Sequence, residues 1–208
     1  MQEKKYKIGI MGGTFDPIHI GHLILGETAY EQFSLDKVLF MPSGNPPHKT
    51  HRTGRASDEQ RMAMVALAIK DNPHFELSLA EMNTDGYSYT YQTLERLSAQ
   101  NPDVQYYFII GADSLCDFDK WREPKRICQA TNIVVATRNH MDNSKLDAKI
   151  DYLRQEFDGT IFKLDSLNID VSSGMLREGI ADGRTVKYYI LDTVNDYIKA
   201  NDIYQQRD

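Results

Sequence analysis

The chain has 208 residues, a formal net charge of −6 and 41% hydrophobic residues. A chain of this length can bury roughly 70% of its unfolded surface, so we expect one domain spanning residues 1–208. The excess of acidic side chains disfavours nucleic acid as a partner, because such binding depends on clustered lysine and arginine. The sequence contains neither an apolar run of about 20 residues nor a secretory leader pattern, so we expect no membrane partner and a cytoplasmic location. The two cysteines form no CxxC pair, which fits a reducing compartment.

Apolar, β-rich runs alternate with helical patterns along the whole chain, which predicts a parallel sheet flanked by helices. The expected strands are Lys7–Met11, Lys37–Met41, Phe75–Leu79, Gln105–Ile110, Asn132–Ala136 and Thr160–Lys163. The expected helices lie near Ile20–Gln32, Ser57–Lys70, Thr90–Ala99 and Lys145–Phe157. The predicted fold class is therefore α/β, a single-domain, Rossmann-like doubly wound parallel sheet, in which ligands bind beyond the carboxyl ends of the strands.

Two finer expectations concern the second helix and the loops. Ser57 and Gln60 form a capping-box pattern, and the apolar face is predicted to consist of Met62, Val65, Ala66 and Ile69. The predicted loops are Pro42–Ala56, after the second strand, and His140–Ser144, after the fifth strand.

The segment from Gly12 to His22 carries the strongest functional signal. It joins the first expected strand to the first expected helix through a glycine turn, which points backbone N–H groups and the positive end of a helix dipole at one spot. His19 and His22 are three residues apart, so on a helix both rings can reach the same anion. Gly21 leaves that face open to a bulky ligand. The segment is neither a phosphate loop ending in Gly-Lys-Ser/Thr nor a three-glycine dinucleotide fingerprint.

A second anion site is predicted near the C-terminus. The segment Val171–Arg177 opens a helix with Ser172 or Ser173 as its N-cap, and Gly183 stops that helix. An ordinary capped helix with a solvated arginine is the alternative interpretation. Its pairing with the histidine turn favours the anion site.

Two further segments leave alternatives open. The loop after the second strand carries cations that either contact ligand phosphate or belong to an ordinary surface: His48, Lys49, Arg52 and Arg55. Trp121, the only tryptophan, either packs against a helix end or stacks on a heterocycle, an interaction worth about 1 to 3 kcal/mol.

These residues also carry a family resemblance. The run Gly12–His22 matches the GTFDPxHxGH signature of the nucleotidyltransferase superfamily, and Val171–Arg177 resembles its ISSTxIR motif. The stretches Pro46–Lys49, Ser88–Thr90 and Gly111–Asp113 are similar to those of the bacterial nicotinate-nucleotide adenylyltransferases in particular. The similarity runs from position 7 to position 204. Two departures stand out: the family often has threonine in the place of Gly174, and commonly tyrosine in the place of Arg122.

The resemblance implies adenylyl transfer from ATP to nicotinate mononucleotide, giving deamido-NAD and pyrophosphate in NAD biosynthesis, with Mg²⁺ as the cofactor that accompanies ATP. His19, His22 and Arg177 would be the catalytic residues, and no residue is assigned as a metal ligand. The implied ATP contacts are Gly12, Gly13, Thr14, Phe15, His19, Gly21, His22, Gly111, Asp113, Ser172, Ser173 and Arg177. The implied acceptor contacts are His48, Lys49, Thr90, Trp121 and Arg122. The partners would be these small molecules, and the sequence leaves a homo-oligomer open.

Other functions share parts of this signature. Adenylyl transfer to phosphopantetheine and cytidylyl transfer to a phosphorylated alcohol use the same first motif. A nucleotide-binding regulator that has lost turnover is a different class, disfavoured by the intact His19, His22, Ser172 and Arg177. A class I aminoacyl-tRNA synthetase ranks last, because this chain is short, acidic and without a Lys-Met-Ser-Lys-Ser loop.

Overall fold

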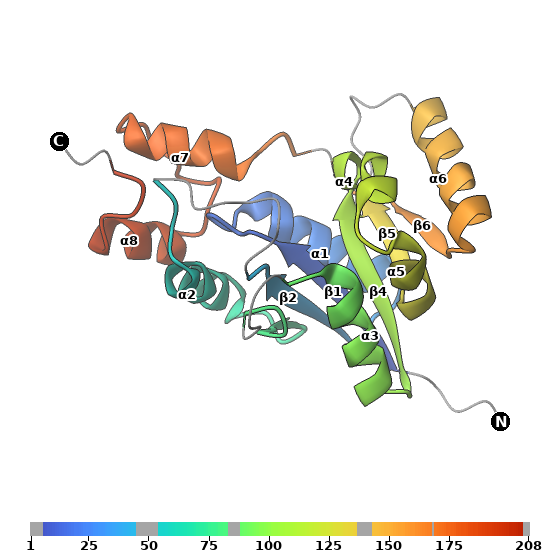
Figure 1. The fold of residues 1–208 in the computed structure, drawn as a ribbon. Helices are drawn as coiled ribbons and strands as arrows, with labels where there is room; N and C mark the ends of the chain where they lie inside the picture. Colours follow the sequence, from blue (N-terminus) through green and yellow to red (C-terminus); the bar gives the residue numbers. More distant parts are fainter. Residues whose placement is uncertain (1–5, 45–53, 83–87, 137–142, 168, 206–208) are drawn as a thin grey trace.

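A six-stranded parallel sheet forms the centre of the computed structural model, which describes residues 6–44, 54–82, 88–136, 143–167 and 169–205 (Figure 1). The strand order is β3-β2-β1-β4-β5-β6, and every pairing in the sheet is parallel. The strands are β1 (Tyr6–Gly13), β2 (Lys37–Pro42), β3 (Phe75–Leu77), β4 (Val104–Gly111), β5 (Asn132–Ala136) and β6 (Ile161–Leu164). The predicted doubly wound α/β fold is confirmed.

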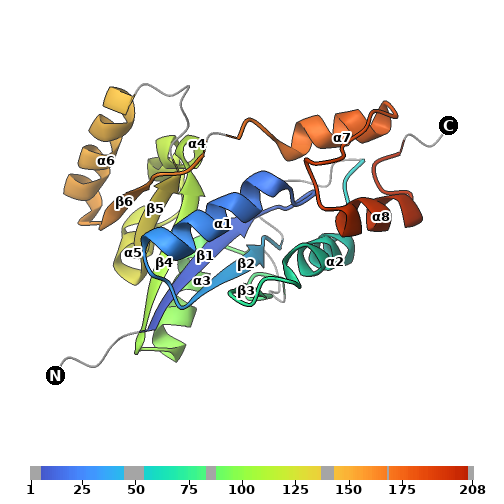
Figure 2. The ribbon, with the colours of Figure 1, turned by 180° about the vertical axis from the view of Figure 1, so that it is seen from behind.

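Helices cover both faces of the sheet, as Figures 1 and 2 show from opposite sides. The helices are α1 (Ile20–Gln32), α2 (Asp58–Ile69), α3 (Thr90–Gln100), α4 (Ala112–Cys116), α5 (Pro124–Ala130), α6 (Asn143–Phe157), α7 (Ser173–Ala181) and α8 (Asp192–Ala200), with a short 3₁₀ turn η1 at Phe118–Lys120. Four of these elements, α4, η1, α5 and α8, were not expected from the sequence. The first three are too short to show a helical period. By contrast, α8 has a detectable pattern, because Val194 and Ile198 lie four residues apart and both are buried.

The four inner strands β1, β2, β4 and β5 contain consecutive buried residues and are therefore buried on both faces, as their apolar runs predict. The edge strands β3 and β6 differ from this expectation, because Glu76, Phe162 and Lys163 are exposed. Within β1, Ile10 belongs to the core beneath α3, α4, α5 and α6, whereas the next residue, Met11, belongs to the core beneath α1, α2, α7 and α8. This alternation gives the sheet two hydrophobic cores. Among the described residues no helix is long and apolar enough to cross a membrane.

Several expected boundaries are corrected by the structure. Gly12 and Gly13 are still strand residues, paired with Met41 and Pro42, so the turn starts only at Thr14. The third strand ends at Leu77 instead of Leu79, and the expected loop at 140–144 yields its last two residues to α6. Its earlier residues lie outside the described part of the chain.

The capping box that starts α2 is present, but the buried face of this helix differs from the expected one. The Ser57 backbone N–H donates to Gln60 Oε1 (2.9 Å), and the Gln60 N–H donates to Ser57 Oγ (3.2 Å). Ala66 is exposed, whereas Arg61 is buried on the face that was expected to be apolar. A pattern based on hydrophobicity counts arginine as a surface residue, so it misses a buried arginine that has partners.

The reversal of strand order lies between β1 and β4. From β1 the chain proceeds to β2 on one side, whereas β4 pairs with the other edge of β1. The crevice at the carboxyl ends of these two strands is the usual ligand site of such sheets. Gly13 ends β1 and Gly111 ends β4, so both lie at this crevice.

Candidate active site

The turn after β1 is held by buried side chains. Phe15 adopts a left-handed conformation (φ 50°), which a bulky side chain tolerates only when its surroundings fix it. Its ring is 1% exposed and packs against Phe40 and edge-on against His22, with ring centroids 5.0 Å apart in the latter pair. The Phe15 side chain therefore belongs to the core, and only its backbone is available to a ligand.

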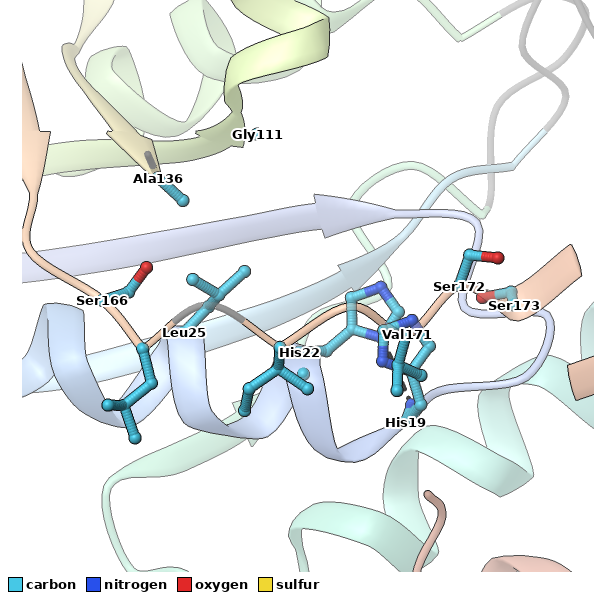
Figure 3. Close-up of a pocket in the computed structure, with 12 residues that line it drawn as sticks. His19, His22, Leu25, Gly111, Ala136, Ser166, Val171, Ser172 and Ser173 are labelled. Carbon is cyan, nitrogen blue, oxygen red and sulfur yellow. Dashed lines mark hydrogen bonds between the residues drawn. The ribbon is translucent and has the colours of Figure 1, made fainter. Parts of the chain in front are cut away.

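The two histidines lie side by side at the start of α1. His19 is the N-cap residue in an extended conformation, and His22 is on the first turn of the helix. Their ring centroids are 3.7 Å apart with an interplanar angle of 30° (Figure 3). The rings therefore act as one unit at the positive end of the α1 dipole.

A hydrogen bond fixes the tautomer of His22. The His19 backbone N–H donates to His22 Nδ1 (3.2 Å), so this nitrogen carries no proton. The proton of the neutral ring is then on Nε2, which makes this atom the donor that His22 offers.

Gly21 permits this arrangement of the rings. A Cβ at this position would lie 3.0 Å from His19 Nδ1 and 3.1 Å from its Cε1. The ring could not withdraw easily, because it is buried and stacked on His22. The close approach of the ring explains the glycine.

A cavity of about 250 Å³ opens next to the histidine pair (Figure 3). Its walls include His19, His22, Ser172 and Ser173, so the structure brings the two predicted anion sites together. Ser172 caps α7 by accepting from the Met175 N–H (3.2 Å). The α1 and α7 N-termini thus both face one concave space, which suits a polyanion.

A second cavity of about 420 Å³ lies on the β4 side. It is lined by Gly12, Gly13, Thr14, Thr90, Asp113, Trp121 and Arg122, among others. The two cavities share His22, Leu25 and Gly111 as walls. A Cβ at Gly111 would meet no atom within 4 Å, so the glycine faces open space where the cavities meet.

Trp121 packs against neighbouring aromatic rings and also borders the second cavity. Its ring packs against Phe118 (centroids 5.4 Å apart) and edge-on against Phe108 (6.2 Å), and it also lines the second cavity. The Arg122 guanidinium lies over the Tyr89 ring, 5.0 Å from its centroid, on the same wall. The second cavity therefore combines a flat aromatic surface with a cation.

Arg177 and Ser173 bind the backbone of the turn after β1, and of the two only Ser173 lines the first cavity. Arg177 Nη1 donates to the Asp16 carbonyl oxygen (2.5 Å), and Ser173 Oγ donates to the Pro17 carbonyl oxygen (2.9 Å). The hydroxyl proton of Ser173 is thus already used, so its backbone N–H is the donor that remains for an anion.

Three residues with evident roles in the site were missed by the sequence analysis. Buried Arg61 donates to the carbonyl oxygens of Thr14 (2.7 Å) and Ser43 (2.8 Å), which braces the turn. Asp16 is fully buried beneath the same turn. Glu81 lines the second cavity, and burial raises the pKa of its carboxyl to about 7, against an opposing effect of Arg96. Of these three residues, only Asp16 could have been recognised from the sequence, because it lies within the GTFDP motif.

The structure describes only one of the four cations expected in the loop after β2. His48, Lys49 and Arg52 are outside the described residues, whereas the Arg55 guanidinium binds Asp16 Oδ2 (3.0 Å). Within the described part of the chain, no three His, Cys, Asp or Glu side chains are grouped so that they could hold a metal ion.

Comparisons with known proteins give one consistent result. A model of the cytidylyltransferase-like family matches residues 10–179. The chain is 40% identical, over 95% of its length and 98% of the relative, to a probable nicotinate-nucleotide adenylyltransferase of Lachnoclostridium phytofermentans. A relative of the same name from Thermoanaerobacter is 37% identical over 98% of this chain and 97% of its own. Among solved structures, the nicotinic acid mononucleotide adenylyltransferase of Plasmodium falciparum complexed with NaAD has a TM-score of 0.78 at 21% identity, covering 96% of this chain and 97% of that one.

Proposed function

The chain belongs to the cytidylyltransferase-like family, and from this premise we propose that it transfers the adenylyl group of ATP to nicotinate mononucleotide. The products are nicotinate adenine dinucleotide and pyrophosphate. One observation carries the proposal: two cavities, one rich in anion donors and one walled by a tryptophan, meet at His22 and Gly111. The near full-length similarity to proteins named for this reaction supports the choice of acceptor.

In this proposal ATP occupies the first cavity and the crevice beside it. Its phosphates are held by the imidazoles of His19 and His22 and by the backbone at Gly12 and Gly13, where β1 ends. Arg177, Ser172 and Ser173 hold the β- and γ-phosphates that leave. Gly111 and Asp113 border the adenosine. The supporting geometry is the convergence of two helix N-termini on one space.

The chemistry requires placement more than proton transfer. The acceptor phosphate is already anionic at neutral pH, so one of its oxygens attacks the α-phosphorus of ATP without a general base. The bond from the α-phosphorus to the bridging oxygen breaks, and pyrophosphate leaves in line. Charge that develops on the departing oxygens is stabilised by His22 Nε2–H, backbone N–H groups and the Arg177 guanidinium.

Magnesium enters this proposal as part of the MgATP substrate. Mg²⁺ bound to nucleotides keeps several waters and takes phosphate oxygens as ligands, so it needs few protein groups. It would neutralise charge on the leaving pyrophosphate.

We assign the second cavity to the acceptor, with Trp121 stacking on the pyridine ring and the backbone of Thr90 and Arg122 facing its carboxylate.

Replacing Arg122 by glutamine is expected to lower the preference for nicotinate over nicotinamide mononucleotide by about tenfold, because a partly screened cation is lost beside an anionic group. The measurement is kcat/KM with both acceptors. Lys120→Gln, which removes the same charge from an exposed side chain two residues earlier, serves as the control. An equal change in both variants would contradict the assignment.

Glu81 is expected to make acceptor binding sensitive to pH. Because its pKa is raised to about 7 by burial, the carboxyl is protonated below that pH and charged above it. The charged form repels an anionic acceptor across the shared cavity, so the KM for nicotinate mononucleotide should rise by up to about tenfold between pH 6 and 8. Glu81→Gln should flatten that rise, whereas Glu156→Gln on the exposed side of α6 should leave it unchanged. Identical profiles for wild type and Glu81→Gln would refute this role.

The proposed function is tested by ATP-dependent release of pyrophosphate with four acceptors measured in parallel: nicotinate mononucleotide, nicotinamide mononucleotide, phosphopantetheine and glycerol phosphate. Release is expected to be fastest with nicotinate mononucleotide. If pyrophosphate is released only with phosphopantetheine, the assigned acceptor is wrong. If none of the four acceptors supports release, the nucleotide-binding regulator is favoured.

We also propose that the reaction takes place in the cytoplasm and that the protein acts without nucleic acid or membrane partners. The net charge of −6 supports the absence of a nucleic acid partner, because an acidic protein repels a polyanion. Whether the chain forms a homo-oligomer can be read from its mass in solution.

A further inference from the structure

Asp16 is a buried carboxylate at the centre of the turn between β1 and α1. Its side chain is 0% exposed. A carboxylate removed from water is stable only when its oxygens are bound by donors. The identity of those donors shows what the turn depends on.

The donors come from three distant parts of the chain. Oδ1 accepts from the Ala56 backbone N–H (3.1 Å) and from the Tyr204 hydroxyl (2.7 Å). Oδ2 accepts from Arg55 Nη1 (3.0 Å), while Arg177 Nη1 lies 3.7 Å from it. The turn is thus tied to the loop before α2, to α7 and to the segment after α8.

Tyr204 is fixed as a donor to this carboxylate. Burial and the neighbouring Asp16 carboxylate raise the pKa of its phenol above the usual range, so the hydroxyl stays protonated at any working pH. The residue is 8% exposed and adopts a left-handed backbone conformation (φ 67°). A non-glycine residue persists in this strained region only where the surroundings hold it in place.

Arg177 does not itself line the first cavity, but its guanidinium lies beside Ser172, which does: a Cβ at Gly174 would be 3.8 Å from Ser172 Oγ and 3.9 Å from Arg177 Nη2. Its Nη1 already donates to the Asp16 carbonyl oxygen, and its side chain is 20% exposed, so the guanidinium is shared between the turn and the surface. Ser173, four residues earlier on α7, is bound to the adjacent Pro17 carbonyl. A movement of Asp16 therefore moves the Arg177 guanidinium.

We propose that Tyr204 is a positioning residue, which acts through Asp16 to hold the Arg177 guanidinium where it meets the pyrophosphate end of ATP. The proposal rests on the function assigned above. Without the hydroxyl, Oδ1 loses one of its two donors, and the cation 3.7 Å from Oδ2 compensates by moving toward the carboxylate. The guanidinium then leaves the phosphates, although Tyr204 itself touches no substrate.

The test compares Tyr204→Phe with Tyr107→Phe. Tyr107 is an equally buried tyrosine whose hydroxyl donates to Gln105 (3.3 Å), and it precedes Gly111 on β4 by four residues. Inorganic pyrophosphate is titrated calorimetrically into each variant, and KM is measured for ATP and for nicotinate mononucleotide. Tyr204→Phe should weaken pyrophosphate binding and raise the KM for ATP by about tenfold, with the KM for the acceptor within about twofold, because misplacement of a single donor affects its own ligand. Tyr107→Phe should change none of these.

Arg177→Ala distinguishes positioning from a general loss of stability. If Tyr204 acts through Arg177, Tyr204→Phe should have no further effect on pyrophosphate binding in the Arg177→Ala background. The proposal is overturned by any of three results: an unchanged pyrophosphate affinity in Tyr204→Phe, an equal effect on both substrates, or the same loss in the Arg177→Ala background.

If Tyr204→Phe does not fold, Arg55→Gln loosens the same carboxylate from the exposed side and carries the same prediction. A wild-type protein that binds pyrophosphate but transfers nothing would disprove the function above, while the comparison of affinities would still decide the role of Tyr204.

Discussion

Replacing His22 or His19 by alanine is expected to lower turnover by about 10²- to 10³-fold and to leave the fold intact, as removal of an oxyanion donor does elsewhere. For His22 the structural reason is specific, because its Nδ1 is occupied by the His19 N–H and its Nε2 proton is the one offered to a phosphate. The measurement is pyrophosphate release at saturating ATP, together with the midpoint of thermal unfolding.

The control for the histidine variants is His74→Ala. His74 stacks on Tyr30, with centroids 4.0 Å apart, and lines neither cavity. It should keep full turnover. A double variant lacking both His19 and His22 that still releases pyrophosphate would refute the mechanism.

Gly111→Val is expected to abolish transfer with little change in stability. The backbone at Gly111 has φ −75° and ψ 158°, which any residue can adopt, and a Cβ there would meet no atom within 4 Å. The new side chain therefore costs the fold little, but it occupies the space that both cavities share. We expect a loss of at least about 10²-fold in kcat/KM, since displacement of reacting groups by about 1 Å is enough for such an effect.

A graded series at the same position provides the control. Gly111→Ala should have a smaller effect than Gly111→Val, and both should unfold within a few degrees of wild type. If Gly111→Val retained wild-type kcat/KM for both substrates, the two cavities could not be the substrate sites.

The architecture could be predicted from the sequence because its signals are local. Buried strands, capping-box residues and the glycine-histidine segment are each contained in a few consecutive residues, and the predicted α/β sheet is confirmed. The predicted anion segments also converge, since Ser172 and His19 line one cavity. Parallel strands with ends at the same edge make such convergence predictable.

The supporting groups could not be predicted, because their partners are remote. Arg61 looks like a surface residue of an amphipathic helix until its guanidinium is seen on the carbonyl oxygens of Thr14 and Ser43. Tyr204 and Asp16 are 188 residues apart and share no sequence pattern. The raised pKa of Glu81 likewise arises from burial, which the sequence does not report.

The distance along the chain between Asp16 and its partners has a consequence for biosynthesis. The glycine-histidine segment is synthesised well before Arg177 and Tyr204, which follow 161 and 188 residues after Asp16. Contacts of such high sequence separation form late. A nascent chain therefore cannot complete the set of donors around Asp16 until residue 204 has been synthesised.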